Sequence, residues 1–102
     1  MKCYTVIFSE ACLSDLQSIS DYICTVSIRE HAIRYARNLR KEIESLSWRA
    51  ETFPVSPYRT VTTRHPNARH FTSRNKKWTI IFHIEGDYVI IDKILASQMI
   101  AG

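Results

Sequence analysis

Glycine, proline and cysteine are all scarce in this chain of 102 residues, which contains two glycines, three prolines and three cysteines. So little glycine and proline excludes a collagen-like or low-complexity disordered chain. No apolar stretch approaches the roughly 20 residues that a membrane-spanning helix needs. The segment Met1 to Phe8 lacks the apolar region and cleavage site of a secretory signal. We therefore expect a cytoplasmic protein without a membrane segment.

The three cysteines, Cys3, Cys12 and Cys24, are odd in number and show no CxxC spacing. If Cys12 and Cys24 share one helix, its rise of about 1.5 Å per residue separates them by roughly 18 Å, too far for a disulfide. Neither a disulfide framework nor a zinc site is predicted, and a reducing cytosol is the natural compartment. The four histidines are scattered as well, so we expect no metal and no cofactor.

The length and charge of the chain narrow its class. Residues 1–102 are expected to form one domain, because two domains would each lack an adequate core. The formal net charge of +4 is a mild excess that attracts anions. A nucleic acid, a nucleic-acid-bound machine or an acidic protein partner would fit this charge, as would a basic domain with no anionic target.

The first half of the chain predicts one strand and two amphipathic helices. Residues 4–8 (YTVIF) are β-branched and aromatic, which is typical of a strand. Ser9 can cap a helix that runs to about Cys24, because apolar residues recur at helical spacing at Cys12, Leu16, Ile19 and Ile23. The S-x-x-E pattern of Ser27 and Glu30 predicts a capping box at the start of a second helix, ending near residues 48–51. Its apolar stripe comprises Ile28, Ala32, Tyr35, Leu39, Ile43 and Leu46.

The second half predicts an irregular connector followed by three strands. Residues 53–67 contain all three prolines, and connectors of this length are often functional. Residues 69–73 predict a weak strand, and residues 78–84 and 88–95 predict strong strands joined by the tight turn Glu85-Gly86-Asp87.

The alternation of side chains along the two strong strands predicts one apolar and one mixed sheet face. The apolar face comprises Ile80, Phe82, Ile84, Val89 and Ile91. The mixed face comprises Thr79, Ile81, His83, Tyr88, Ile90, Asp92 and Ile94. We expect the first face to pack on the helices. The second can be covered by the connector, by the C-terminal tail or by another chain.

Three segments together resemble the RelE/ParE toxin superfamily: YTVIFSEACLSDLQSISDYI, AIRYARNLRKEIESL and WTIIFHIEGDYVIIDKIL. The resemblance runs from about Tyr4 to Leu95 and rests on the combination, not on one motif. It implies an α+β fold of order β-α-α-β-β-β, with a twisted, mainly antiparallel sheet packed against two N-terminal helices. It also implies the toxin of a type II toxin–antitoxin system, whose cognate antitoxin wraps the toxin and masks its active surface.

The superfamily holds two mechanisms. ParE-like members resemble poisons of DNA gyrase, whereas RelE-like members resemble enzymes that cut mRNA in the ribosome. This chain has Thr79 where RelE-like chains commonly carry Arg, and its tail Ala96–Gly102 contains no Arg, Tyr or His. These departures favour a ParE-like toxin that inhibits gyrase or a related nucleic-acid machine. Many ParE-like tails carry a His or Arg pair that is also missing here, so a non-toxic partner-binding module remains a third hypothesis.

A RelE-like ribonuclease would need a base, an acid and cations for the phosphate. The candidates are His83, His70, Arg69 and Arg59. The alternatives are a half-buried His83 that packs on Tyr88 and a solvated edge strand around His70.

Two binding surfaces are also predicted. A basic patch for nucleic acid or another target would comprise Arg59, Arg64, His65, Arg74, Lys76 and Lys77, with Trp78 stacking on a base. Alternatively, these charges are only solvated and Trp78 belongs to the core. Antitoxin-binding candidates are Arg34, Arg37 and Lys41 on the second helix and Ile81, Tyr88 and Ile90 on the mixed face. The alternative for the three cations is a solvated helix face.

Overall fold

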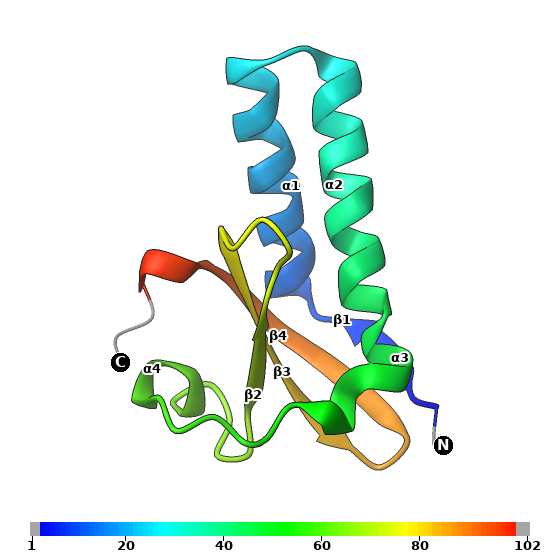
Figure 1. The fold of residues 1–102 in the computed structure, drawn as a ribbon, viewed down its shortest axis with the longest axis vertical. Coiled ribbons are helices and arrows are strands. Elements are labelled where there is room, and N and C mark those ends of the chain that lie inside the picture. The colour runs from blue at the N-terminus through cyan, green and yellow to red at the C-terminus, as the bar shows by residue number, and fades with distance from the viewer. Residues whose placement is uncertain (1–2, 100–102) are drawn as a thin grey trace.

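A hairpin of two long helices stands on one face of a four-stranded sheet in the computed structural model, which describes residues 3–99. Strand β1 (Thr5–Phe8) leads into helix α1 (Glu10–Val26) and helix α2 (Arg29–Glu44). Three further strands follow: β2 (Arg69–Thr72), β3 (Trp78–Glu85) and β4 (Tyr88–Ala96). The turn between the helices lies at the end of the molecule farthest from the sheet (Figure 1).

The sheet has the strand order β1-β4-β3-β2. Strand β1 runs parallel to β4, and the other two pairs are antiparallel. The predicted β-α-α-β-β-β order and the mainly antiparallel sheet are therefore confirmed. No helix within residues 3–99 has the length and apolar character needed to cross a membrane.

The predicted cap of the first helix is confirmed, but the predicted capping box of the second is wrong. The hydroxyl of Ser9 accepts the backbone N–H of Cys12 at 3.1 Å, as an N-cap residue does. Ser27, by contrast, has an extended backbone that ends α1. The N-cap position of α2 is taken by Ile28, which has no side-chain capping bond. Because α1 continues to Val26, Ser27 lies in the turn between the two helices and does not cap α2.

The second helix is interrupted at Ser45, where the sequence predicts continuity to residues 48–51. The Ser45 hydroxyl donates to the Glu42 carbonyl at 2.5 Å, and the Ser45 N–H is shared between the Lys41 and Glu42 carbonyls. Such local bonds tighten and bend a helix. The chain continues as helix α3 (Leu46–Arg49) and the 3₁₀ turn η1 (Ala50–Thr52). The bend keeps Leu46 and Ala50 in the core, where both are fully buried.

The main core lies between the helices and one face of the sheet. As predicted, the sheet contributes Ile80, Phe82, Val89 and Ile91. The helices contribute buried residues of the predicted stripes, among them Cys12, Leu16, Ile19, Leu39 and Ile43. Ile28, at the far turn of the hairpin, is 66% exposed and does not belong to this core.

A β-bulge corrects one predicted face. Along β3 and β4, Ile81 pairs with Lys93 but Phe82 pairs with Ile91, which leaves Asp92 as an extra residue in β4. The bulge reverses the alternation, so Ile94 lies opposite Ile80 and packs in the main core. The placement of Ile94 on the mixed face is therefore wrong, because a strict period of two does not anticipate an inserted residue.

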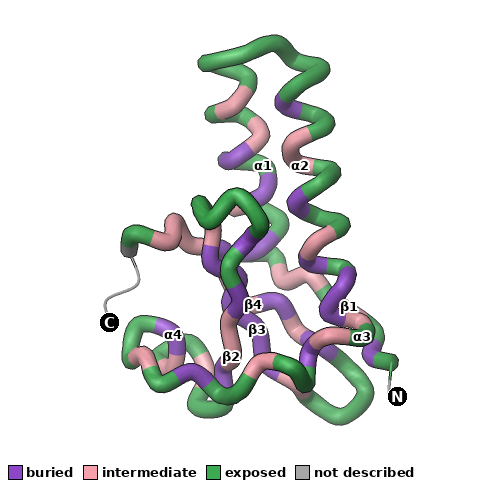
Figure 2. Tube along the Cα trace, in the orientation of Figure 1, coloured by how far each residue is buried: buried purple, intermediate pink, exposed green. Residues whose placement is uncertain are grey.

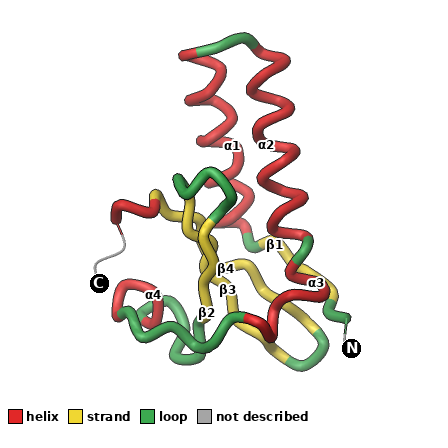
Figure 3. Tube along the Cα trace, viewed as in Figure 1, coloured by secondary structure: helices red, strands yellow, loops and turns green. Residues whose placement is uncertain are grey.

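The connector covers part of the second sheet face, one of the three predicted possibilities. It is mostly loop (Figure 3), with one short helix, α4 (Arg59–Thr62), that the sequence does not predict. Val61 and Ala68 pack on Ile81 in a small second core, and all three side chains are fully buried. Figure 2 shows buried positions in this segment as well as between the helices and the sheet.

Asp15 on α1 fastens the helix to the bulged strand. One carboxylate oxygen accepts the ammonium of Lys93 at 2.7 Å, and the other accepts the backbone N–H of Ile94 at 3.0 Å. Ser9 adds a third bond at the same place, because its hydroxyl donates to the Asp92 carbonyl at 3.2 Å. The irregular backbone of the bulge is thus stabilised by side chains from the start of α1.

We predict that Asp15→Ala lowers the free energy of unfolding by about 2–3 kcal/mol, because it removes two bonds to a charged group in a partly buried position. Asp15→Asn should lose less, since an amide oxygen can still accept the N–H of Ile94. Urea unfolding measures the free energy of unfolding of both Asp15 variants. Asp21→Ala, at an exposed carboxylate on the same helix, should change stability by less than about 0.5 kcal/mol. Equal losses for Asp15→Ala and Asp21→Ala would contradict this account.

Candidate functional site

His83 lies at the centre of a small polar cluster on the connector-covered face of the sheet. Its Nδ1 is 2.7 Å from an Asp92 carboxylate oxygen, and its Nε2 is 3.4 Å from Glu85. The ring of His65, which comes from the connector, stacks on the His83 ring at 3.9 Å with an interplanar angle of 3°. The bulge positions the first of these contacts, since Asp92 is its extra residue.

The chemistry available to His83 is limited by these contacts. A carboxylate on one ring nitrogen orients an imidazole, as in many acid–base sites. Here, however, the second nitrogen faces Glu85, His65 covers one ring face, and only 7% of the residue is exposed. The cluster joins the connector to the sheet, and a substrate has little access to it.

The four residues predicted for a ribonuclease are not brought together. His70 pairs with Ile81 and faces the connector, where its Nδ1 lies 3.0 Å from the Ser56 hydroxyl. Arg69 is its neighbour in β2 and therefore faces the helix side of the sheet. There Arg69 donates to the Phe53 carbonyl at 2.7 Å. Arg59 is exposed on α4.

The predicted basic patch is divided by β2. Arg59, Arg64 and His65 belong to the connector that precedes this strand, whereas Arg74, Lys76 and Lys77 belong to the loop that follows it. Both groups of arginines and lysines are exposed. The structure thus offers two smaller basic surfaces at opposite ends of one strand.

Trp78 is held in place by the helix hairpin. Its indole N–H donates to the Tyr35 hydroxyl at 2.9 Å, and the ring packs against the main core. Asn75 donates to the same hydroxyl at 2.7 Å. These contacts fit the alternative of a core residue better than a base-stacking platform.

The predicted antitoxin contacts fall on separate surfaces. Arg34, Arg37 and Lys41 are exposed along α2. Arg37 borders a groove of about 480 Å³ between α1 and α2, together with the exposed apolar residues Leu13 and Ile33. On the sheet, Tyr88 is exposed and Ile90 is half-buried. Ile81 is fully buried beneath the connector, so a partner reaches it only if that segment moves.

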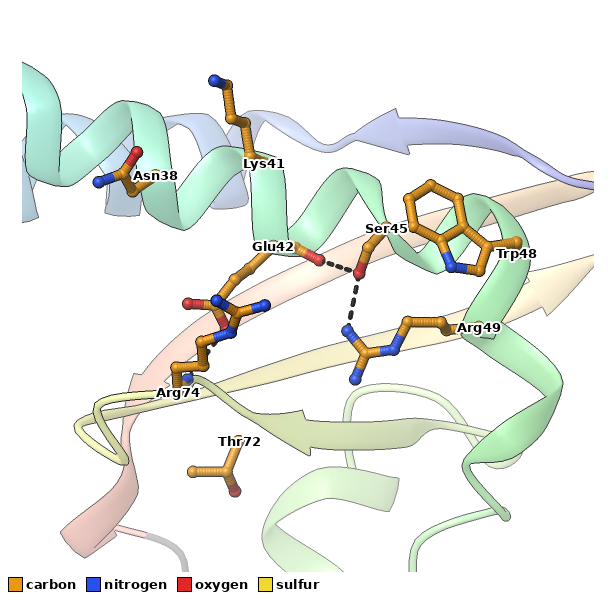
Figure 4. Close-up of a pocket in the computed structure, with 8 residues that line it drawn as sticks. All are labelled: Asn38, Lys41, Glu42, Ser45, Trp48, Arg49, Thr72 and Arg74. Carbon is orange, nitrogen blue, oxygen red and sulfur yellow. Dashed lines mark hydrogen bonds between the residues drawn. The ribbon is translucent and has the colours of Figure 1, made fainter.

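A cleft that the sequence does not predict lies between the end of α2, α3 and β2 (Figure 4). Its volume is about 870 Å³. The residues that line it are Asn38, Lys41, Glu42, Ser45, Trp48, Arg49, Thr72 and Arg74. Trp48 and Arg49 follow the bend at Ser45. The sequence predicts one continuous helix here. It therefore does not indicate that these two side chains line a cleft together with a strand some 25 residues later in the chain.

Within the described residues, no group of three or more His, Cys, Asp or Glu side chains is arranged to hold a metal ion. Cys12 is fully buried in the main core, and burial raises the pKa of its thiol to about 12, so it is not a thiolate nucleophile at neutral pH. Cys3 and Cys24 are exposed, free thiols.

Position 79 and the tail bear on the choice between mechanisms. Thr79 is buried, and its hydroxyl lies 3.0 Å from that of Ser97. The start of the tail therefore contacts the position where RelE-like chains commonly carry Arg. The segment Ala96–Gly102 contains no basic residue, and its residues 100–102 lie outside the described range.

Comparisons with known proteins agree with this architecture. A solved structure described as "Chromosomal ParDE TA system from P. aeruginosa" superposes with a TM-score of 0.78. It covers 92% of this chain and 96% of its own, at 17% sequence identity, so it shows a shared fold. No curated protein sequence matches the chain significantly.

The helix hairpin on a mixed four-stranded sheet is therefore the fold of that ParDE structure. The model of the family described as "ParE toxin of type II toxin-antitoxin system, parDE" matches residues 6–101. The match spans nearly the whole chain, and the chain belongs to the ParE toxin family.

The protonation of His70 gives a pH-dependent prediction. Burial lowers its pKa below the ordinary value of 6.5. The unfolded chain therefore binds a proton at a pH where the folded chain does not, and folding stability falls as the pH drops below 6.5 toward the folded pKa. We predict that His70→Gln loses less stability than the parent chain between about pH 7.5 and about pH 5.5, measured by urea unfolding.

His31→Gln is the matched control, because His31 is exposed on α2. It should lose stability over this pH interval as the parent chain does. If His70→Gln and the parent chain fell equally, His70 would not be the source of the acid sensitivity.

Proposed function

We propose that this ParE family member arrests growth by inhibiting DNA gyrase or a related nucleic-acid machine in the cytoplasm. A cognate antitoxin neutralises it. The observation that carries this proposal is the family match over residues 6–101. The fold shared with a ParDE protein supports it independently.

The arrangement of polar residues supports a toxin that acts by binding. Cleavage of RNA requires a base, an acid and cations around one phosphate. In this chain the sheet separates Arg69 from His70 and His83, and His83 is already engaged by Asp92 and His65. Inhibition of a protein target needs no such constellation.

The antitoxin has a candidate docking groove between the two long helices. Leu13 and Ile33 are exposed apolar residues there, and Arg37 and Arg40 stand beside them. An amphipathic segment with apolar anchors and acidic neighbours would bury the first pair and neutralise the second. The exposed Tyr88 on the sheet is a second anchor point for a segment that wraps around the molecule.

The proposal is tested by assaying the purified protein in two reactions, gyrase supercoiling and messenger cleavage during in vitro translation. We expect supercoiling to be inhibited and the messenger to stay intact. His70→Gln and His83→Gln, each first shown to fold by thermal unfolding, should inhibit gyrase to within about twofold of the parent chain.

Two outcomes would overturn the proposal. Messenger cleavage that both histidine variants abolish would establish the RelE-like endonuclease instead. Induced expression without any growth defect, together with active gyrase, would indicate a non-toxic module that only binds a partner. Co-expression of the adjacent open reading frame identifies the antitoxin. It should restore growth whether the toxin inhibits gyrase or cleaves messenger RNA.

A further inference from the structure

The cleft beside α3 gathers positive charge in a hollow that the proposed function leaves unused. Lys41, Arg49 and Arg74 line it, against one carboxylate, Glu42. Glu42 accepts the backbone N–H of Arg74 at 3.0 Å and so ties the loop after β2 to α2. This bond keeps Arg74 at the edge of the cleft, and Figure 4 shows Arg49 and Arg74 reaching toward the same space from opposite sides.

Three contacts fix the side chain of Arg49 at the cleft. One guanidinium nitrogen donates to the Ser45 hydroxyl at 2.8 Å. The guanidinium also lies over two aromatic rings, 5.4 Å from the centre of Phe53 and 5.6 Å from that of Phe71. A guanidinium carries five N–H donors in a planar fork that matches phosphate oxygens. The bond to Ser45 uses one of them, which leaves the other donors for an anion in the cleft.

Trp48 adds a flat aromatic surface at the rim of the cleft. Trp48 is 56% exposed. It precedes Arg49 in the sequence and lines the same cleft. An indole has a large apolar face and a polar N–H, and tryptophan is enriched where proteins contact a ligand or partner. Trp78, by contrast, is committed to Tyr35 and the core, which leaves Trp48 as the tryptophan able to stack on a ligand.

We propose that this cleft binds single-stranded nucleic acid, with one base stacked on Trp48 and the neighbouring phosphates on Arg49, Arg74 and Lys41. Proteins that bind single strands combine a basic groove with such a stacking platform. The volume of about 870 Å³ lies in the range of pockets that hold a nucleotide-sized ligand. An acidic peptide would match the charge, but it could stack on the indole only through an aromatic residue, whereas every nucleotide carries a flat base.

This site goes beyond the proposed function, because inhibition of gyrase through protein contacts alone requires no nucleic-acid cleft. Lys76 and Lys77 are exposed in the same loop as Arg74 and add to its positive charge. A single strand held here would bring the toxin to DNA or RNA that a nucleic-acid machine has already opened.

The test is fluorescence anisotropy of a labelled single-stranded oligonucleotide of roughly 12 nucleotides, titrated with the purified full chain. With three phosphate contacts, affinity should fall by about tenfold to twentyfold between about 50 mM and about 200 mM salt. Trp48→Ala should weaken binding by about tenfold through the loss of stacking. Arg74→Gln should weaken it and reduce the salt dependence by about one charge.

Arg29→Gln is the matched control, because it removes the same charge from an exposed site at the start of α2, whereas the cleft lies at the end of that helix. It should bind within about twofold of the parent chain. Arg59→Gln and Arg64→Gln test the connector in the same titration. Arg49 contacts core aromatics, so Arg49→Gln is interpreted only with an unchanged thermal unfolding curve. The same variants are assayed for gyrase inhibition, which keeps a failure of the cleft distinct from a failure of the proposed function.

Three results would overturn the proposal. The first is no binding of the oligonucleotide at low salt. The second is binding that Arg59→Gln or Arg64→Gln weakens while Trp48→Ala and Arg74→Gln do not, which would place the site on the connector. The third is an acidic peptide that binds more tightly than the oligonucleotide and is unaffected by Trp48→Ala, which would make the cleft a peptide site.

Discussion

The β-bulge at Asp92, the extra residue in β4, is the constraint on which most of this structure depends. Before the bulge, Val89 and Ile91 face the helices, and after it Ile94 does. The irregular backbone is stabilised from α1, through the Ser9 hydroxyl on the Asp92 carbonyl and the Asp15 carboxylate on the Ile94 N–H. On the opposite face the Asp92 side chain orients His83, on which His65 fastens the connector. One inserted residue therefore links both layers that cover the sheet.

The fold was largely predictable, because it follows from periodicity. Apolar residues at helical spacing and alternating strands near the C-terminus indicate the order of elements and most of the main core. Local irregularities were not predictable in the same way. The bulge, the bend at Ser45 and the placement of Ser27 outside the cap of α2 each depend on tertiary contacts or on the geometry of chain reversal. Helix α4 is too short to produce a periodic signal.

The candidate sites were harder to predict than the fold, because nearness in sequence is a poor guide on a sheet. Arg69 and His70 are adjacent in the chain but lie on opposite faces. Conversely, Arg49 and Arg74 are distant in sequence and line one cleft. Composition indicated that a basic surface exists, and only the topology shows how its charges are divided. Family membership indicates a toxin, whereas the arrangement of its surfaces has to be taken from the structure.

The parallel pairing of β1 with β4 has a consequence for the time at which this molecule becomes complete. Thr5 lies beside Tyr88, so the first strand finds its partner only after β4 has been synthesised. Contacts between such distant segments form late, because they require the closure of a long loop. During synthesis the helix hairpin can form early, but the sheet beneath it cannot. A growing chain that does not yet contain β4 therefore lacks the finished sheet.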